Sequence, residues 1–160
     1  MKDNSVIERH IMSVLVDNEP GVLARVIGLF SGRGYNIESL TVSETDPERA
    51  LSRISIVTSG TPMVIEQIKA QLARLVPIHA VRDLTEHDVA IERELALVKI
   101  INHGEERIEA LRIADTFRAR TLDSTLDSFV FEVTGNSSKV DAFVNLCLLY
   151  TSPSPRDPNR

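Results

Sequence analysis

The fold is decided by the stretch Ser13-Val14-Leu15-Val16-Asp17-Asn18-Glu19-Pro20-Gly21-Val22-Leu23-Ala24-Arg25-Val26. The apolar, β-capable run His10–Val16 predicts a strand, and Asp17–Gly21 is a dense turn signal. The apolar residues after the turn recur on one helical face, and Gly32 with Gly34 marks the end of that helix. They are Val22, Leu23, Val26, Ile27, Leu29 and Phe30. We therefore expect strand, loop and helix in succession, with the helix over about Gly21–Ser31.

The chain continues with two strands, a helix and a further strand. Tyr35–Ser43 and Leu51–Thr58 are strand-like runs on either side of a charged loop, Glu44–Ala50, and should pair as a hairpin. Thr61 is placed to cap a second helix that starts at Pro62. The buried stripe of this helix is Ile65, Ile68, Leu72 and Leu75, and the closing strand is Ile78–Val81.

This order of elements predicts an α+β fold. Strand, helix, strand, strand, helix, strand is the split βαβ pattern of a ferredoxin-like unit, expected here over residues 9–83. Two helices would cover one face of a four-stranded antiparallel sheet and leave the other face open. An uncovered face with β-branched residues has to be buried, and a second copy of the chain is the simplest cover. We therefore expect the domain to oligomerise.

A second, incomplete module should follow an acidic linker over residues 84–91. Over residues 92–146 we expect a strand, Arg93–Ile101, then a helix and a hairpin of Thr121–Ser124 with Phe129–Thr134. A last helix should be capped by Ser137 or Ser138. The stripe of the first helix is Ile108, Leu111, Ala114 and Phe117, and that of the last is Val140, Phe143 and Val144. The sequence therefore predicts a truncated βαββα module.

The last fourteen residues, 147–160, are expected to be non-native. They contain three of the seven prolines and follow a helical pattern that they cut short. The stretch Cys147–Asp157 resembles a translated sequencing adapter, so we exclude it from fold reasoning. The alternative is a natural proline-rich tail.

Composition narrows the classes of function. With 18 Lys plus Arg against 23 Asp plus Glu, the net charge of −5 disfavours a nucleic-acid partner. No apolar run is long enough to cross a membrane, and the start of the chain is too polar for a signal peptide, so we expect a cytoplasmic protein. The single cysteine and four scattered histidines do not have the spacing of a metal site. We also find no nucleophile with a base, and no glycine-rich phosphate loop.

The loop before the first helix is the one place that suits a small anion. A helix N-terminus presents unpaired backbone N–H groups and a partial positive charge, so a carboxylate could dock at Gly21, Val22 and Leu23. Asp17 and Asn18 could then meet an ammonium group, which would make the ligand an amino acid. The alternative is that Asn18 and Gly21 only shape a turn, and the residues alone leave both interpretations open.

Longer stretches resemble a known family, the small regulatory subunits of acetolactate synthase. The resemblance covers about residues 9–146 and lies in the following segments: Ser13–Val26, Phe30–Leu40, Ser52–Ile54, Glu66–Ile68, Val76–Pro77, Glu92–Leu95 and Asp141–Phe143. It implies that the first unit is an ACT domain, whose copies pair side by side. In that family the chain runs on through a final strand that this sequence lacks.

The resemblance also implies a ligand, a partner and site residues. The family's valine-binding loop matches Asn18, Glu19, Pro20, Gly21, Val22 and Leu23, and a contact made across the dimer matches Asn36. Ala24 stands where some relatives have Ser. The chain would have no active site of its own. It would activate a catalytic large subunit in branched-chain amino-acid biosynthesis and confer feedback inhibition by L-valine, while thiamine diphosphate, magnesium and flavin would bind to that partner.

Two other classes of function compete with this one. A stand-alone ACT-type amino-acid sensor or transcriptional regulator would need a DNA-binding element, and no basic helix-turn-helix pattern is present. A small enzyme on the same fold would need reactive side chains such as a nucleophile with a base, and we find none in the sequence.

Overall fold

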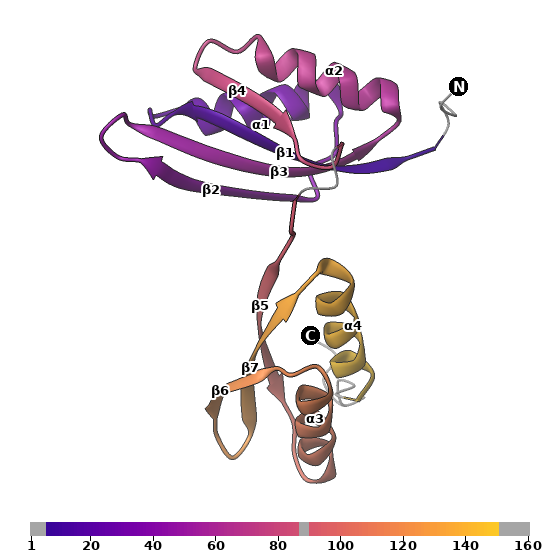
Figure 1. Ribbon diagram of the computed structural model, residues 1–160. Coiled ribbons are helices and arrows are strands. Elements are labelled where there is room, and N and C mark those ends of the chain that lie inside the picture. Colours follow the sequence, from indigo (N-terminus) through magenta and orange to yellow (C-terminus); the bar gives the residue numbers. More distant parts are fainter. Residues whose placement is uncertain (1–5, 87–89, 151–160) are drawn as a thin grey trace. The chain divides into compact units, whose positions relative to one another are not determined.

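The computed structural model describes residues 6–86 and 90–150. Within these ranges the chain divides between Ala90 and Ile91 into two compact units, each with its own apolar core. Figure 1 shows one sheet and two helices in each unit. The predicted element order, βαββαβ and then βαββα, is confirmed.

The first unit is a ferredoxin-like α+β domain. Its elements are β1 (Glu8–Asp17), α1 (Val22–Arg33), β2 (Ser39–Asp46), β3 (Leu51–Gly60), α2 (Pro62–Ala73) and β4 (Ile78–Asp83). The strands form an antiparallel sheet in the order β2-β3-β1-β4. Strand β1 is therefore central, and the loop that it feeds into α1 starts from the middle of the sheet.

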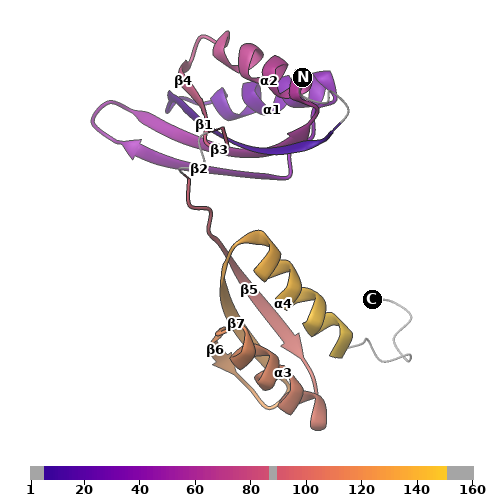
Figure 2. The ribbon, with the colours of Figure 1, turned by 45° about the vertical axis from the view of Figure 1, so that its right-hand side comes forward.

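Both helices cover the same face of this sheet, and among the described residues of the unit, 6–86 and 90, no helix covers the other face (Figure 1 and Figure 2). The core lies between sheet and helices, and alternate residues of β1 point into it. Its largest fully buried side chains include Phe30, Met12, Ile54, Ile65 and Leu72. The predicted open face is confirmed in this unit.

The two helices begin as the sequence predicts, but α1 is longer and buries a narrower face. Gly32 lies inside α1, and the helix ends at Gly34, whose positive φ of 69° lets its N–H bond the Ser31 carbonyl at 3.2 Å. Leu23 and Ile27, predicted to be buried, are 38% and 42% exposed. The Thr61 hydroxyl accepts a hydrogen bond from Val64 N, which confirms the predicted cap of α2.

Strand β2 is shifted toward the C-terminus from its predicted place at Tyr35–Ser43. Residues 35–38 lie before the strand, because Tyr35 and Ile37 pack against the core from an irregular segment. The strand then extends through Glu44 and Asp46, which were predicted to be loop. Strand β2 is at the edge of the sheet and mostly exposed, so charged side chains there remain in water.

The second unit contains β5 (Glu94–Ile101), α3 (Glu105–Thr116), β6 (Arg120–Ser124), β7 (Ser128–Gly135) and α4 (Ser137–Tyr150). Its three strands are antiparallel in the order β5-β7-β6. The core combines side chains of the sheet with side chains of both helices. Four phenylalanine rings are in contact with one another there: Phe117, Phe129, Phe131 and Phe143.

The predicted stripe of α3 was partly wrong. Ile108 and Leu111 are 55% and 45% exposed, whereas the buried residues are Ala110, Ile113 and Ala114. A stripe that recurs every three residues drifts around a helix of 3.6 residues per turn, and spacings of three and four keep to one face.

The start and the end of α4 also differ from the prediction. Neither Ser137 nor Ser138 is the cap, because the Asn136 Oδ1 accepts the hydrogen bond from Lys139 N at 2.9 Å. The helix does not stop before Cys147 but continues to Tyr150. Cys147 follows Phe143 by four residues, so it lies on the same buried face and is 3% exposed.

Candidate functional site

The candidate site is the loop that joins the central strand β1 to α1. Gly21 precedes the helix with φ 87° and ψ −8°, a left-handed conformation in which a side chain is strained. Apart from Gly21 and its two chain neighbours, no residue has a heavy atom within 4 Å of the position that a Cβ would take. Glycine is therefore needed for the backbone, and it leaves open space beside the helix N-terminus.

The first turn of α1 has no compensating negative charge. No side chain caps the helix at Gly21, and none of the first-turn residues is acidic. Val22 N makes only a long bond of 3.4 Å to the Glu19 carbonyl. The partial positive charge at the start of α1 is thus available to an anion that approaches over Gly21.

The loop is held by hydrogen bonds to the segments that precede β3 and β4, the two strands next to β1. Asn18 N donates to the Ala50 carbonyl at 2.7 Å, and its amide Nδ2 donates to Glu44 Oε1 at 3.0 Å. On the other side Asp17 N donates to the Pro77 carbonyl at 2.9 Å. The Asp17 carboxylate also lies 2.5 Å from His79 Nε2.

These partners were not found by sequence analysis. We predicted that Asp17 and Asn18 would be directed at an ammonium group, but each has a partner within the chain. Glu44 comes 26 positions after Asn18, and His79 comes 62 positions after Asp17. Only the pairing of the strands brings them together, and no local pattern signals it. The loop and the strands beside it carry three carboxylates, Asp17, Glu19 and Glu44. Two of them are already paired, Asp17 with His79 and Glu44 with Asn18.

Asn36 does not join the loop within one chain. It lies beyond the end of α1, and the loop lies before the start of this 12-residue helix, so about 18 Å of helix separates them. The Asn36 side chain is exposed, and its carbonyl accepts a hydrogen bond of 2.5 Å from the Thr58 hydroxyl. A site built from both parts would need two chains.

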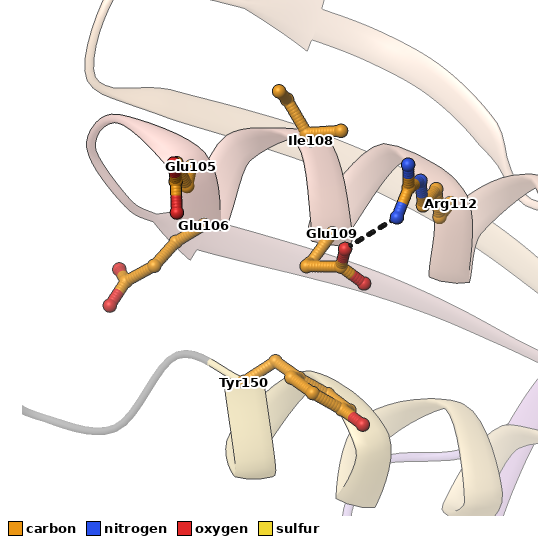
Figure 3. Close-up of a pocket in the computed structure, with 6 residues that line it drawn as sticks. All are labelled: Glu105, Glu106, Ile108, Glu109, Arg112 and Tyr150. Atoms are coloured by element: carbon orange, nitrogen blue, oxygen red, sulfur yellow. Dashed lines mark hydrogen bonds and ion pairs between the residues drawn. The ribbon is translucent and has the colours of Figure 1, made fainter.

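A hollow of about 320 Å³ in the second unit is chemically different from the loop (Figure 3). It lies beside α3 and the end of α4, and its lining residues are Glu105, Glu106, Ile108, Glu109, Arg112 and Tyr150. Arg112 is paired with Glu109 at 2.8 Å, so the remaining charges are two glutamates. Such a lining repels a carboxylate ligand.

The described residues also limit other interpretations. In residues 6–86 and 90–150, no group of three or more His, Cys, Asp or Glu side chains is arranged to hold a metal ion. None of the helices in these ranges is both long and apolar enough to cross a membrane.

Two family models match the two units one after the other. Residues 12–80 match the AHAS small subunit-like ACT domain, and residues 93–151 match the small subunit of acetolactate synthase. A probable acetolactate synthase small subunit of Archaeoglobus fulgidus is 47% identical over 142 residues, which are 89% of this chain and 87% of the relative. The chain belongs to the acetolactate synthase small-subunit family.

Other members agree with this assignment. The small subunit of acetolactate synthase isozyme 3 of Escherichia coli K12 is 48% identical over 85% of this chain and 82% of its own. The crystal structure of an acetolactate synthase small subunit from Thermotoga maritima has a TM-score of 0.78 and 38% identity, and the match covers 87% of this chain and 86% of that one. The predicted family is thus confirmed, and the first unit of this small subunit is its ACT domain.

Proposed function

We propose that the chain is a regulatory, non-catalytic subunit that binds L-valine between two ACT domains. Through this site it would activate a catalytic large subunit and make that subunit sensitive to feedback inhibition. The observation that carries the proposal is the open start of α1, where Gly21 leaves space in front of a helix end that no side chain caps.

The chemistry of the loop fits an α-amino acid. The ligand carboxylate would accept hydrogen bonds from the N–H groups of the first turn, at Gly21, Val22 and Leu23. The ammonium would meet the carboxylate side of the loop, where Glu44 is held by Asn18 at 3.0 Å. Glu19 and Pro20 shape the loop between these two ends. Opposite charges are thus offered to the two ends of one small zwitterion.

The apolar part of the ligand would be covered by the second chain. Leu23 and Ile27 follow each other by one helical turn and are both partly exposed on α1. A partner chain that covers them would also bring its own Asn36 toward the loop. The face of the sheet that the helices leave open is a further surface that a homodimer could bury, and it includes the apolar residues Ile11, Leu15 and Val57. The proposal therefore treats the dimer as a requirement of the site.

Regulation follows if valine favours one arrangement of the paired domains. A ligand shifts an equilibrium only through different affinities for the two states, and coupling free energies of about 1–3 kcal/mol are typical. The catalytic chemistry, with thiamine diphosphate, magnesium and flavin, would belong to the large subunit. The complex would work in the cytoplasm.

Thermal unfolding with added amino acids tests the proposal. A ligand that binds only the folded state stabilises it by RT ln(1 + [L]/Kd), so L-valine should raise the Tm with dose. D-Valine and L-lysine serve as controls, because they place the side chain wrongly or add a charge to the apolar part. A shift with L-valine alone, together with co-purification of the large subunit, supports the proposal. Equal shifts with all three amino acids would contradict it.

A further inference from the structure

Three buried polar residues gather at the end of the ACT domain opposite to the ligand loop. His10 on β1, Thr58 on β3 and Asp83 at the end of β4 are 7%, 0% and 9% exposed. Burying polar groups costs free energy unless they are hydrogen-bonded. Each of the three is hydrogen-bonded, and the proposed function uses none of them.

Asp83 connects this cluster to the start of the linker. Its carboxylate lies 2.6 Å from His10 Nδ1 and accepts a hydrogen bond of 3.0 Å from Thr85 N. The Thr85 hydroxyl in turn accepts from Ile11 N at 3.0 Å, and Leu84 N donates to the Ile11 carbonyl at 2.8 Å. The first linker residues are thus bound to the central strand.

Charged side chains surround the cluster and hold a further linker residue. Glu8 lies 3.2 Å from His10 Nε2. Lys69 of α2 lies 4.0 Å from Asp83, 2.6 Å from Glu66 and 2.5 Å from Glu86. Burial lowers the pKa of Lys69, but its hydrogen bonds to Glu66 and Glu86 outweigh this and raise the pKa above its usual value. Lys69 is therefore a cation that binds the linker to α2.

Thr58 connects the same cluster to Asn36. In the register of β1 with β3 Thr58 is directly opposite His10, with both side chains on the helix-covered face. Its hydroxyl donates to the Asn36 carbonyl at 2.5 Å, which fixes the backbone that carries the Asn36 side chain. Two positions along, Glu38 is held by Arg9 at 3.3 Å and by the Ser59 hydroxyl. The irregular segment before β2 is therefore fastened to β1 and β3 rather than free to move alone.

We infer that Thr58, His10 and Asp83 are positioning residues that couple the Asn36 half of the valine site to the linker. The inference rests on the proposed function. A displacement of Asn36 by ligand moves the carbonyl that Thr58 holds. Thr58 faces His10 as its neighbour on the adjacent strand, without a hydrogen bond between the two side chains. From His10 the displacement reaches Asp83 and then Thr85 through their hydrogen bonds, and from Thr85 the chain leads to the second unit. Coupling is carried by such contiguous packed and hydrogen-bonded groups when they shift together.

The test compares binding with response in the complex with the catalytic large subunit. Thr58→Val removes the hydroxyl at nearly constant volume, and Thr58→Ser keeps it. His10→Gln loses the bond to Asp83 without touching Asn36. Ile56→Val, on the same face of β3, is the control for a small loss of core stability. Acetolactate formation is measured against L-valine concentration, and L-valine binding is measured on each isolated chain by calorimetry.

The coupling predicts that Thr58→Val and His10→Gln need at least about fivefold more valine for half inhibition, or lose part of the maximal inhibition. Thr58→Ser and Ile56→Val should behave as the parent does. The isolated His10→Gln chain should bind valine as the parent chain does. The double variant should lose no more valine inhibition than the more affected single variant, since both substitutions interrupt the same connection.

The result that would overturn the inference is full valine inhibition in the His10→Gln and Thr58→Val complexes. An equal loss of valine inhibition in the Ile56→Val complex would also overturn the inference, because the loss would then follow from lower core stability alone. A parent complex that valine does not inhibit would contradict the proposed function itself, so the two failures are distinguishable.

Discussion

Replacing Gly21 separates backbone strain from charge at the proposed valine site. Gly21 has a φ of 87°, so any side chain there is strained by about 1–2 kcal/mol, whatever its chemistry. Nothing lies within 4 Å of the added Cβ, so Gly21→Ala introduces no clash. The alanine variant should be less stable by that amount and should still bind valine. Gly21→Asp carries the same strain and adds a carboxylate where the ligand carboxylate docks.

The charge effect can be bounded with Coulomb's law. Two unit charges about 4 Å apart repel by about 1 kcal/mol in water and about 4 kcal/mol at an effective dielectric constant of 20. Gly21 is exposed, so the loss of affinity should lie between about fivefold and about a thousandfold. Calorimetric titration with L-valine measures it on the parent, Gly21→Ala and Gly21→Asp.

A matched control adds the same charge away from the loop. Gly28 lies in the middle of α1 with open space beside it and no positive φ. Gly28→Asp should therefore bind valine as the parent does. Equal affinities of Gly21→Asp and Gly21→Ala would refute the assignment of the ligand carboxylate to the start of α1.

Three further predictions concern the stability and packing of the two units. Thr61→Ala removes the acceptor for Val64 N and should destabilise the ACT domain by about 1 kcal/mol, measured by urea unfolding. Phe143→Ala should cost the second unit about 3–5 kcal/mol and leave the valine-dependent Tm of the ACT domain unchanged, which calorimetry of the full chain checks. Burial raises the pKa of Cys147 to about 11, so the native thiol should react with iodoacetamide much more slowly at pH 8 than the unfolded chain. Equal labelling rates in the folded and unfolded chain would contradict the packing of α4. Because the pKa of the Cys147 thiol is higher in the folded state than in the unfolded state, the free energy of unfolding should fall as the pH rises from about 9 toward 11.

The sequence predicts the order of elements because their signals are local. Thr61 with Pro62 marks the start of α2, and the run of apolar, β-capable residues before the Asp17–Gly21 turn marks β1. The errors in the predicted elements occur where tertiary packing, and not the local sequence, determines the structure. Tyr35 and Ile37 look like strand residues but pack from an irregular segment, and a three-residue repeat misplaces the buried face of α3. Asn136, rather than either serine, caps α4, because its side chain accepts the hydrogen bond from Lys139 N.

In the candidate site, too, the sequence predicts the features that depend on local residues and misses those that depend on tertiary contacts. The turn residues Asn18–Gly21 can be read from the sequence because glycine before an apolar helix has a local meaning. The partners of the loop cannot. Glu44 reaches it because β2 pairs with β3 and β3 pairs with β1, and His79 reaches it because β4 pairs with β1. The separation of Asn36 from the loop is likewise a property of the folded helix. It agrees with the contact across the dimer that the resemblance implies for Asn36.

The most direct test of the central claim is the number of valine sites in mixed dimers. Chains with Gly21→Asp keep Asn36 and lose the loop, whereas chains with Asn36→Ala keep the loop and lose the contact across the dimer. In a twofold dimer of one chain of each kind, one of the two sites combines an intact loop with an intact Asn36. Titration calorimetry of the unfolded and co-refolded mixture should therefore show tight valine binding that neither variant shows alone, at about one site per mixed dimer. A mixture that binds no better than the separate variants would contradict a site shared between two chains.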